Sequence, residues 1–239
     1  MLTLYNANAL DVLAAWEGPP IASVITDPPY ASGGASLAER QKSTADKYTS
    51  TKGHCPYPDF VGDGMDQRSW GNLMRRILEA ARANALPGAV LCMYIDWRQY
   101  PALSDAIQWA GWIWRGTAVW DKMSSRPQRG RFRQQTEYIL WASNGALPID
   151  RPVPCLPGVF QAANVSPKAR LHQTQKPLEI MRQIVRITLP GGLILDPFCG
   201  SGTTLEAARL EGYDAVGIEA SPQIARTAAE RLGVDAAKI

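Results

Sequence analysis

Residues that bind metals or form disulfides are scarce in this sequence. Its 239 residues include only two histidines, His54 and His172, and four cysteines with no C-x-x-C spacing among them. A structural zinc site needs four such ligands grouped in short motifs, so we expect no metal site. Cysteines without a pairing pattern are typical of a reducing compartment, which predicts a cytoplasmic protein.

Long apolar runs are also absent. No stretch approaches the ~20 apolar residues that cross a bilayer, and the opening "MLTLYNANAL" lacks the charged and apolar segments of a secretory signal. The formal net charge is only +3, which alone says little about partners. A hydrophobic content of 46% is ample for a core. The length suits one large α/β domain or two small ones.

The chain alternates between two kinds of segment. Continuous apolar runs are typical of buried parallel strands, and they occupy residues 22–26, 88–95, 192–196 and 214–219. Amphipathic patterns predict helices over residues 70–86, 177–189, 203–212 and 221–233. Strands that alternate with helices favour a doubly wound α/β sheet of mostly parallel strands.

Residues 112–120 and 136–143 have the composition of two further strands, which we expect to form an antiparallel hairpin. Their connection contains cations and no acid. The cations are Lys122, Arg126, Arg129, Arg131 and Arg133. Composition alone leaves two interpretations of this run, a solvated loop or a surface for an acidic partner.

Two segments fit neither pattern. Residues 31–64 are rich in Ser, Gly, Thr and Lys, and residues 144–171 contain five prolines and no clear period. Long irregular insertions in a compact domain are usually functional or disordered. The composition of residues 31–64 buries little surface, which predicts a mobile insertion.

The tetrapeptide Asp27-Pro28-Pro29-Tyr30 follows the first of the apolar runs. Proline has no backbone N–H and a carboxylate only accepts hydrogen bonds, so the segment offers no donor before Tyr30. The prolines also keep it extended. A rigid set of acceptors beside an aromatic ring suits a planar ring that carries an NH₂ group, such as the exocyclic amine of a nucleobase. A turn that simply ends a strand is the alternative.

A glycine-rich turn, Gly200-Ser201-Gly202, lies between a predicted strand that ends at Asp196 and a predicted helix. The next predicted strand ends at Glu219. Glycines let a ligand approach the backbone at a helix N-terminus, and an acid at the end of the next strand can accept from ribose hydroxyls. The pattern predicts a ligand with an adenosyl ribose. The NAD fingerprint has a third glycine where this chain has Leu205; S-adenosylmethionine is the other candidate.

Together, Asp27-Pro28-Pro29-Tyr30 and the segment 196–202, "DPFCGSG", resemble the amino-DNA methyltransferases, which methylate the exocyclic amine of adenine or cytosine. The catalytic tetrapeptide comes first and the cofactor motif last, an order that resembles the beta subclass. Residues 96–99, 129–145 and 172–192 resemble further motifs of that family.

The resemblance implies a Rossmann-like fold with a circularly permuted motif order. It implies one S-adenosylmethionine-dependent domain over residues 1–239, in which residues 144–171 are the candidate target-recognition insertion. The strands before Asp27 and Asp196 would be neighbours, with both motifs at the carboxyl edge of the sheet.

The resemblance also implies roles for individual residues. Asp27 and the Pro28 carbonyl would accept the two N–H bonds of the target amine, and Tyr30 would stack on the base. Glu219 would hold the ribose of the cofactor and Lys176 would lie near its methionine carboxylate. The full set of residues expected around the cofactor is Asn8, Ala9, Asp27, Lys176, Asp196, Pro197, Phe198, Cys199, Gly200, Ser201, Gly202, Thr203, Thr204, Glu219 and Ala220. Asn8 stands in a segment, "YNANALDVL", where the family usually has Gly-Asp in place of Ala7-Asn8.

Double-stranded DNA is the partner that the resemblance implies, with the target base flipped out of the duplex. The cations between residues 122 and 133 then become candidate phosphate or groove contacts. A homodimer and a cognate restriction enzyme are further partners that the resemblance raises.

The motifs are compatible with more than one methylated group. In this family Asp at the first position of the tetrapeptide is associated mainly with adenine N6 and Ser mainly with cytosine N4, so Asp27 favours adenine. Cytosine N4 is the closest alternative. RNA and protein-glutamine methyltransferases use a similar tetrapeptide, but the arginine-rich hairpin favours DNA. A non-catalytic module that binds the cofactor and DNA is the alternative of another class.

Overall fold

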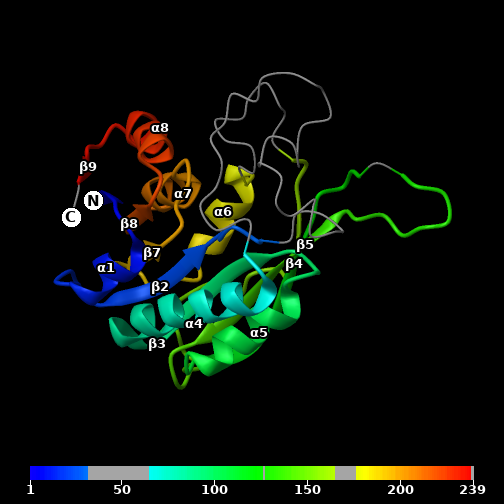
Figure 1. Cartoon of the computed structure of the whole chain (residues 1–239). Helices are drawn as coiled ribbons and strands as arrows, with labels where there is room; N and C mark the ends of the chain where they lie inside the picture. Colours follow the sequence, from blue (N-terminus) through cyan, green and yellow to red (C-terminus); the bar gives the residue numbers. More distant parts are fainter. Residues whose placement is uncertain (32–64, 126, 165–175, 238–239) are drawn as a thin grey trace.

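The computed structural model describes residues 1–31, 65–125, 127–164 and 176–237 (Figure 1). Within these ranges one nine-stranded sheet runs in the order β6-β4-β5-β3-β2-β7-β8-β1-β9. The strands are β1 (Leu2–Asn6), β2 (Ile21–Thr26), β3 (Ala85–Ile95), β4 (Ile113–Asp121), β5 (Thr136–Ser143), β6 (Val159–Gln161), β7 (Leu193–Asp196), β8 (Asp214–Glu219) and β9 (Ala236–Ala237).

All neighbouring strands are parallel except β5, which runs antiparallel to both β3 and β4. The mostly parallel sheet with an antiparallel hairpin is therefore confirmed. The reversal of β5 matters for the site, because the first residues of β5 lie at the same edge of the sheet as the last residues of the parallel strands.

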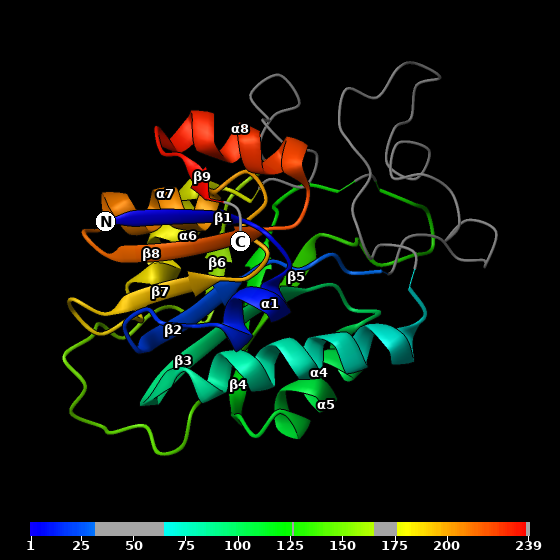
Figure 2. The same cartoon turned by 60° about the vertical axis from the view of Figure 1, so that its left-hand side comes forward.

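Helices cover both faces of the sheet (Figures 1 and 2). On one face lie α1 (Ala9–Ala14), α4 (Gln67–Ala83) and α5 (Tyr100–Trp109), and on the other lie α6 (Leu178–Val185), α7 (Thr203–Leu210) and α8 (Pro222–Leu232). Each layer has its own apolar core, one built around Trp70 and Met74 and the other around Ile180 and Leu205. A sheet covered on both faces explains why its central strands are continuous apolar runs.

The helix predicted over residues 70–86 begins and ends earlier than expected. Asp66 caps α4, since its side chain accepts hydrogen bonds from the Arg68 N–H (3.0 Å) and the Ser69 N–H (3.1 Å). The last residues of the predicted helix belong instead to β3, where Ala85 pairs with β2. Pairing within the sheet overrides the helix propensity of Ala85.

The helix predicted over residues 177–189 is shorter, because α6 ends at Val185. The backbone then tightens, with the Ile187 N–H donating to the Ile184 carbonyl at 3.0 Å, an i→i+3 bond. Pro190 follows, three residues before β7 begins, and cannot continue a helix.

The strand β6 lies inside residues 144–171, so the prediction that this segment contains neither strand nor helix was wrong in part. It pairs parallel with β4 at the edge of the sheet, and three residues are too few to show a strand period. Residues 165–175 of this segment and residues 32–64 of the other predicted insertion lie outside the described ranges. The target-recognition role of residues 144–171 stays a prediction.

Among the described residues, no helix is both long enough and apolar enough to span a membrane.

Candidate active site

The two motifs meet at the carboxyl ends of β2 and β7. These strands are neighbours, with Val24 opposite Leu195, and the tetrapeptide and the glycine-rich turn follow them directly. The Thr26 hydroxyl donates a hydrogen bond to Asp196 Oδ1 at 2.5 Å and so ties the two strand ends together. The predicted juxtaposition is confirmed, at the edge of the sheet where ligands of such folds bind.

The glycine-rich turn has a backbone that side chains would obstruct. Gly202, the N-cap of α7, has φ of 81°, and a Cβ there would lie 2.8 Å from Leu232 Cδ1. Its N–H donates to the Cys199 carbonyl at 2.8 Å. Gly200 has φ of 52° with open space where a Cβ would be. The backbone of the turn is therefore closely packed at Gly202, whereas at Gly200 there is open space beside it.

Glu219 ends β8 and faces this turn. Its Oε2 accepts from the Gly200 N–H at 3.1 Å and its Oε1 from the Ser221 N–H at 2.8 Å. Burial raises the pKa of the Glu219 carboxyl, while these N–H donors oppose that rise. The bond to Gly200 links the acid at the end of β8 to the turn that follows the neighbouring strand β7.

Asp196 lies beneath the turn and is 2% exposed. Burial raises the pKa of its carboxyl to about 6, against the opposing hydrogen bonds from the Thr204 and Thr26 hydroxyls. The Phe198 N–H also donates to Asp196 Oδ1, at 3.1 Å. A carboxylate that is costly to ionise is therefore held at the junction of the two motifs.

The raised pKa of Asp196 predicts a pH-dependent stability. Because the folded-state pKa of about 6 exceeds the ordinary 3.8, protonated Asp196 stabilises the fold below pH 4, and this stability is lost as the pH rises through 6. Asp196→Asn should therefore raise the free energy of unfolding at pH 8 by about 1–3 kcal/mol, and by much less at pH 4.5. Urea unfolding at both pH values measures this. An equal loss of stability at both would contradict it.

The tetrapeptide Asp27-Pro28-Pro29-Tyr30 is held from two sides. The indole N–H of Trp70, on α4, donates to the Pro29 carbonyl at 2.7 Å. Asp27 Oδ1 accepts from the Tyr30 hydroxyl at 2.7 Å, and Asp27 Oδ2 accepts from Lys176 Nζ at 2.6 Å. Burial raises the pKa of the Asp27 carboxyl, opposed by the charge of Lys176. Within the described ranges, no donor contacts the Pro28 carbonyl, the other expected acceptor.

The side chain of Lys176 is buried, although the residue lies just before the start of α6. It is 6% exposed, and its Nζ lies 5.2 Å from the ring centroid of Tyr30 and 5.3 Å from that of Tyr94. Burial disfavours the ammonium, but the charges of Asp27 and Glu137 outweigh it and raise the pKa of Lys176. The structure thus places Lys176 on the Asp27 carboxylate itself.

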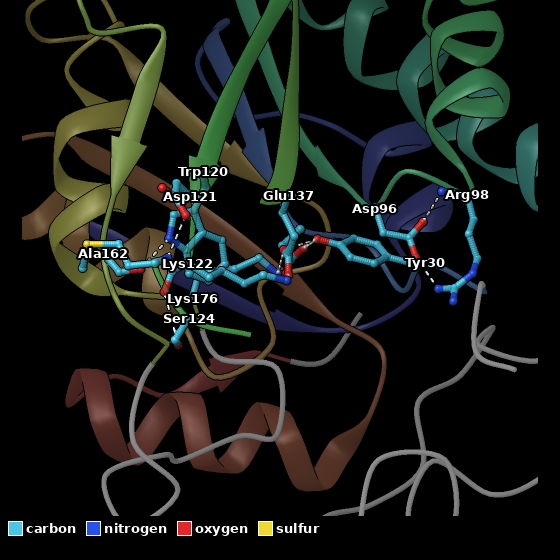
Figure 3. A network of polar contacts seen from close by, with 12 residues as sticks. Tyr30, Asp96, Arg98, Trp120, Asp121, Lys122, Ser124, Glu137, Ala162 and Lys176 are labelled. Atoms are coloured by element: carbon cyan, nitrogen blue, oxygen red, sulfur yellow. Dashed lines mark hydrogen bonds and ion pairs between the residues drawn. The ribbon is translucent and has the colours of Figure 1, made fainter. Parts of the chain in front are cut away.

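Glu137 is the site residue that the sequence analysis missed. It is the second residue of β5, and its side chain stands between Tyr30 and the two lysines of the site (Figure 3). Its Oε2 lies 3.1 Å from the Tyr30 hydroxyl and 3.4 Å from Lys176 Nζ, and its Oε1 lies 3.4 Å from Lys122 Nζ. Burial works against ionisation of Glu137, but the two lysines prevail and lower its pKa.

The first expected cofactor residues, Asn8 and Ala9, begin α1 beside this edge. The Asn8 side chain accepts from the Leu10 N–H at 2.9 Å and caps the helix. The preceding strand pairs with β8 so that Asn6 is opposite Glu219. Asn8, two residues after the residue opposite Glu219, is exposed, while Ala9 is buried.

The cations of the β4–β5 connection divide into two groups. Lys122 pairs with Glu137 and is mostly buried, whereas Arg129, Arg131 and Arg133 are exposed and form no ion pair with a described residue. Figure 1 shows the connection extending away from the sheet. Arg126 lies outside the described residues.

A doubly wound sheet with an acidic, proline-rich tetrapeptide beside a glycine-rich turn, and an acid bonded to that turn, is the arrangement expected of an amino-methyltransferase. The sequence matches the family N6_N4_Mtase, described as DNA methylase, over residues 21–151 and 155–230. The chain therefore belongs to the N6/N4 DNA methylase family.

Individual relatives cover nearly the whole chain. YubD of Escherichia coli (strain K12) is 28% identical over 236 residues, which are 97% of this chain and 90% of YubD. The crystal structure of the M1.HpyAVI–SAM complex has a TM-score of 0.71 at 21% identity and covers 98% of this chain and 100% of that one. PvuII DNA methyltransferase, titled cytosine-N4-specific, has a TM-score of 0.68 at 16% identity and covers 96% and 87%. These likenesses confirm the fold.

Proposed function

We propose that this protein transfers a methyl group from S-adenosylmethionine to the exocyclic N6 of adenine in duplex DNA. The observation that carries the proposal is the meeting of Asp27 and the cofactor turn at adjacent strand ends, joined by the bond from Thr26 to Asp196. Membership in the DNA methylase family supports the substrate class.

The residues of the turn fit S-adenosylmethionine, which when bound supplies an electrophilic methyl group. Open space at Gly200 admits a ligand to the backbone at the start of α7. Glu219, with lone pairs left on both oxygens, accepts from the ribose hydroxyls. The ligand has no pyrophosphate, which agrees with a turn that lacks a third glycine.

The protein's task in the reaction is positioning. The adenine amine is a poor nucleophile because its lone pair is delocalised into the ring, so the enzyme must hold it in an attacking geometry. Asp27 and the Pro28 carbonyl accept its two N–H bonds, which favours a pyramidal nitrogen and aims the lone pair at the methyl carbon. The N–C bond would form as the C–S bond breaks and S-adenosylhomocysteine leaves, and the Asp27 carboxylate would take the proton that the amine then loses and pass it to solvent. Tyr30 stacks on the flipped base.

Adenine rather than cytosine is the finer part of the proposal, and Asp27 at the first position of the tetrapeptide supports it. The fold does not decide between them, since a protein titled cytosine-N4-specific shares it. We expect N6-methyladenine in DNA methylated by the purified protein, measured by nucleoside mass spectrometry. N4-methylcytosine alone would overturn the choice of base but leave methyl transfer to DNA standing.

The exposed arginines of the β4–β5 connection provide the proposed DNA contact. Changing Arg129, Arg131 and Arg133 together to Ala should weaken duplex binding and lower the slope of log K against log salt by about one per arginine. Fluorescence anisotropy over a series of salt concentrations measures both. Arg75→Ala, which removes an arginine paired with Glu79 on α4, is the matched control. An unchanged slope in the triple variant would contradict the contact.

A further inference from the structure

Four charged side chains alternate in sign along the catalytic edge. In order they are Asp27, Lys176, Glu137 and Lys122, which we call the ion-pair chain. Successive members lie 2.6, 3.4 and 3.4 Å apart. Asp27, Glu137 and Lys122 meet because β5 starts at the edge where β2 and β4 end, and Lys176 joins them from the segment before α6. Figure 3 shows Glu137 beside Lys122 and Lys176.

The arrangement poses a problem for the proposed reaction. Asp27 must accept an N–H bond from the target amine, yet both of its oxygens already accept hydrogen bonds, one from Tyr30 and one from Lys176. The bond from Lys176 is short and charge-assisted, which makes it the stronger of the two. Each oxygen of Asp27 keeps a lone pair for the amine, but the ammonium at 2.6 Å neutralises much of the carboxylate charge and weakens Asp27 as an acceptor.

Glu137 offers the same two donors a second acceptor. Its Oε2 lies 3.1 Å from the Tyr30 hydroxyl and 3.4 Å from Lys176 Nζ. The hydroxyl has one hydrogen, so it donates to only one of the two acids at a time. A small shift can therefore move both donors from Asp27 to Glu137 without leaving the buried ammonium unpaired, which would be costly.

Lys122 completes the arrangement from the other side. It lies 3.4 Å from Glu137 Oε1, the oxygen that faces away from Lys176. With a lysine at each oxygen, Glu137 stays ionised in this partly buried position and so keeps the charge that attracts Lys176.

We propose that Glu137 is a positioning residue that takes over Lys176 and the Tyr30 hydroxyl when the target amine enters, which makes Asp27 a stronger acceptor for that amine. This inference rests on the proposed function. Glu137 does not touch the base; it acts through Lys176 and Tyr30 on the acceptor capacity of Asp27.

The first test is Glu137→Gln, which keeps the size and one acceptor oxygen but removes the charge. The single-turnover rate at saturating DNA and S-adenosylmethionine should fall about 10–100-fold. The dissociation constant of the cofactor should change less than about threefold, because Glu137 contacts no residue of the cofactor turn. Glu137→Asp, which keeps the charge, should recover part of the rate. Glu79→Gln, an exposed acid on α4, is the control for loss of one carboxylate.

The second test separates this role from a structural one. Lys176→Met removes the ammonium that Glu137 is proposed to draw away, so Glu137→Gln should cause almost no further loss of rate in that background. If the rate of the double variant falls by the product of the two single-variant factors, the proposal is overturned. A wild-type rate in Glu137→Gln alone would also overturn it.

Product analysis of the wild-type protein in the same assay keeps the two proposals distinguishable. If the product is N4-methylcytosine, the choice of adenine fails while the variant rates still test Glu137. If wild-type protein transfers no methyl group to DNA, both proposals fail.

Discussion

Replacing Asp27 with alanine is expected to lower the rate of methyl transfer about 100–1000-fold, the effect seen when one preorganised polar contact to a reacting group is lost. The affinity for S-adenosylmethionine should change only a few-fold, since Asp27 is assigned to the target amine. The fold should persist, because the buried Lys176 keeps Glu137 as a partner at 3.4 Å. Transfer of a labelled methyl group, measured in single turnover, gives the rate, and calorimetry gives the affinity.

Two further variants sharpen this prediction. Asp27→Asn keeps one acceptor oxygen and should retain more activity than the alanine variant. Asp105→Ala removes an exposed acid of α5, which belongs to neither motif, and should behave as wild type. An Asp27→Ala protein that methylates DNA at the wild-type rate would end the mechanism.

The sequence predicted the parts of this fold that depend on local pattern. Apolar runs located the central strands to within three residues, and the resemblance of the motifs gave the adjacency of β2 and β7, which the pairing of Val24 with Leu195 confirms. The errors lie where local preference competes with tertiary contacts. Ala85 is a good helix former that the sheet recruits into β3.

The site was predictable only in part, for a geometric reason. Asp27 and Glu219 each stand at the end of a recognisable strand, so their positions follow from the sheet. The meeting of Asp27, Lys176 and Glu137 depends on the direction of β5 and on a contact across 149 residues. A single glutamate at the start of a strand carries no pattern that would assign it to the site.

Lys122 is a second residue whose place in the site could not be predicted from the sequence. In the sequence it belongs to a run of cations, and composition gives no reason to separate it from the arginines. Its backbone, however, still follows β4, with its N–H donating to the Gln135 carbonyl at 2.8 Å. The side chain is therefore directed to Glu137 on β5, whereas the arginines belong to the exposed part of the connection.

Replacing Glu219 with alanine is expected to weaken S-adenosylmethionine binding by roughly 1.5–3 kcal/mol, because a charged acceptor for the ribose hydroxyls is lost. The loss corresponds to about 10–150-fold in the dissociation constant. Duplex affinity should stay unchanged, because Glu219 faces the cofactor turn. Glu219→Gln keeps one acceptor oxygen, so its cofactor affinity should lie between those of the wild type and the alanine variant. Glu230→Ala, which removes an exposed acid of α8, should bind the cofactor as the wild type does.

The pH dependence of cofactor binding gives Glu219 a second signature. Burial raises the pKa of its carboxyl, so the ionised form that accepts from the ribose is lost at a higher pH than for an ordinary glutamate. Cofactor affinity in the wild type should therefore fall as the pH is lowered through this raised pKa, and Glu219→Gln should lack that part of the fall. Calorimetric titrations of both proteins across the acidic range measure the difference. Parallel pH profiles, or an alanine variant with undiminished affinity, would contradict the ribose role.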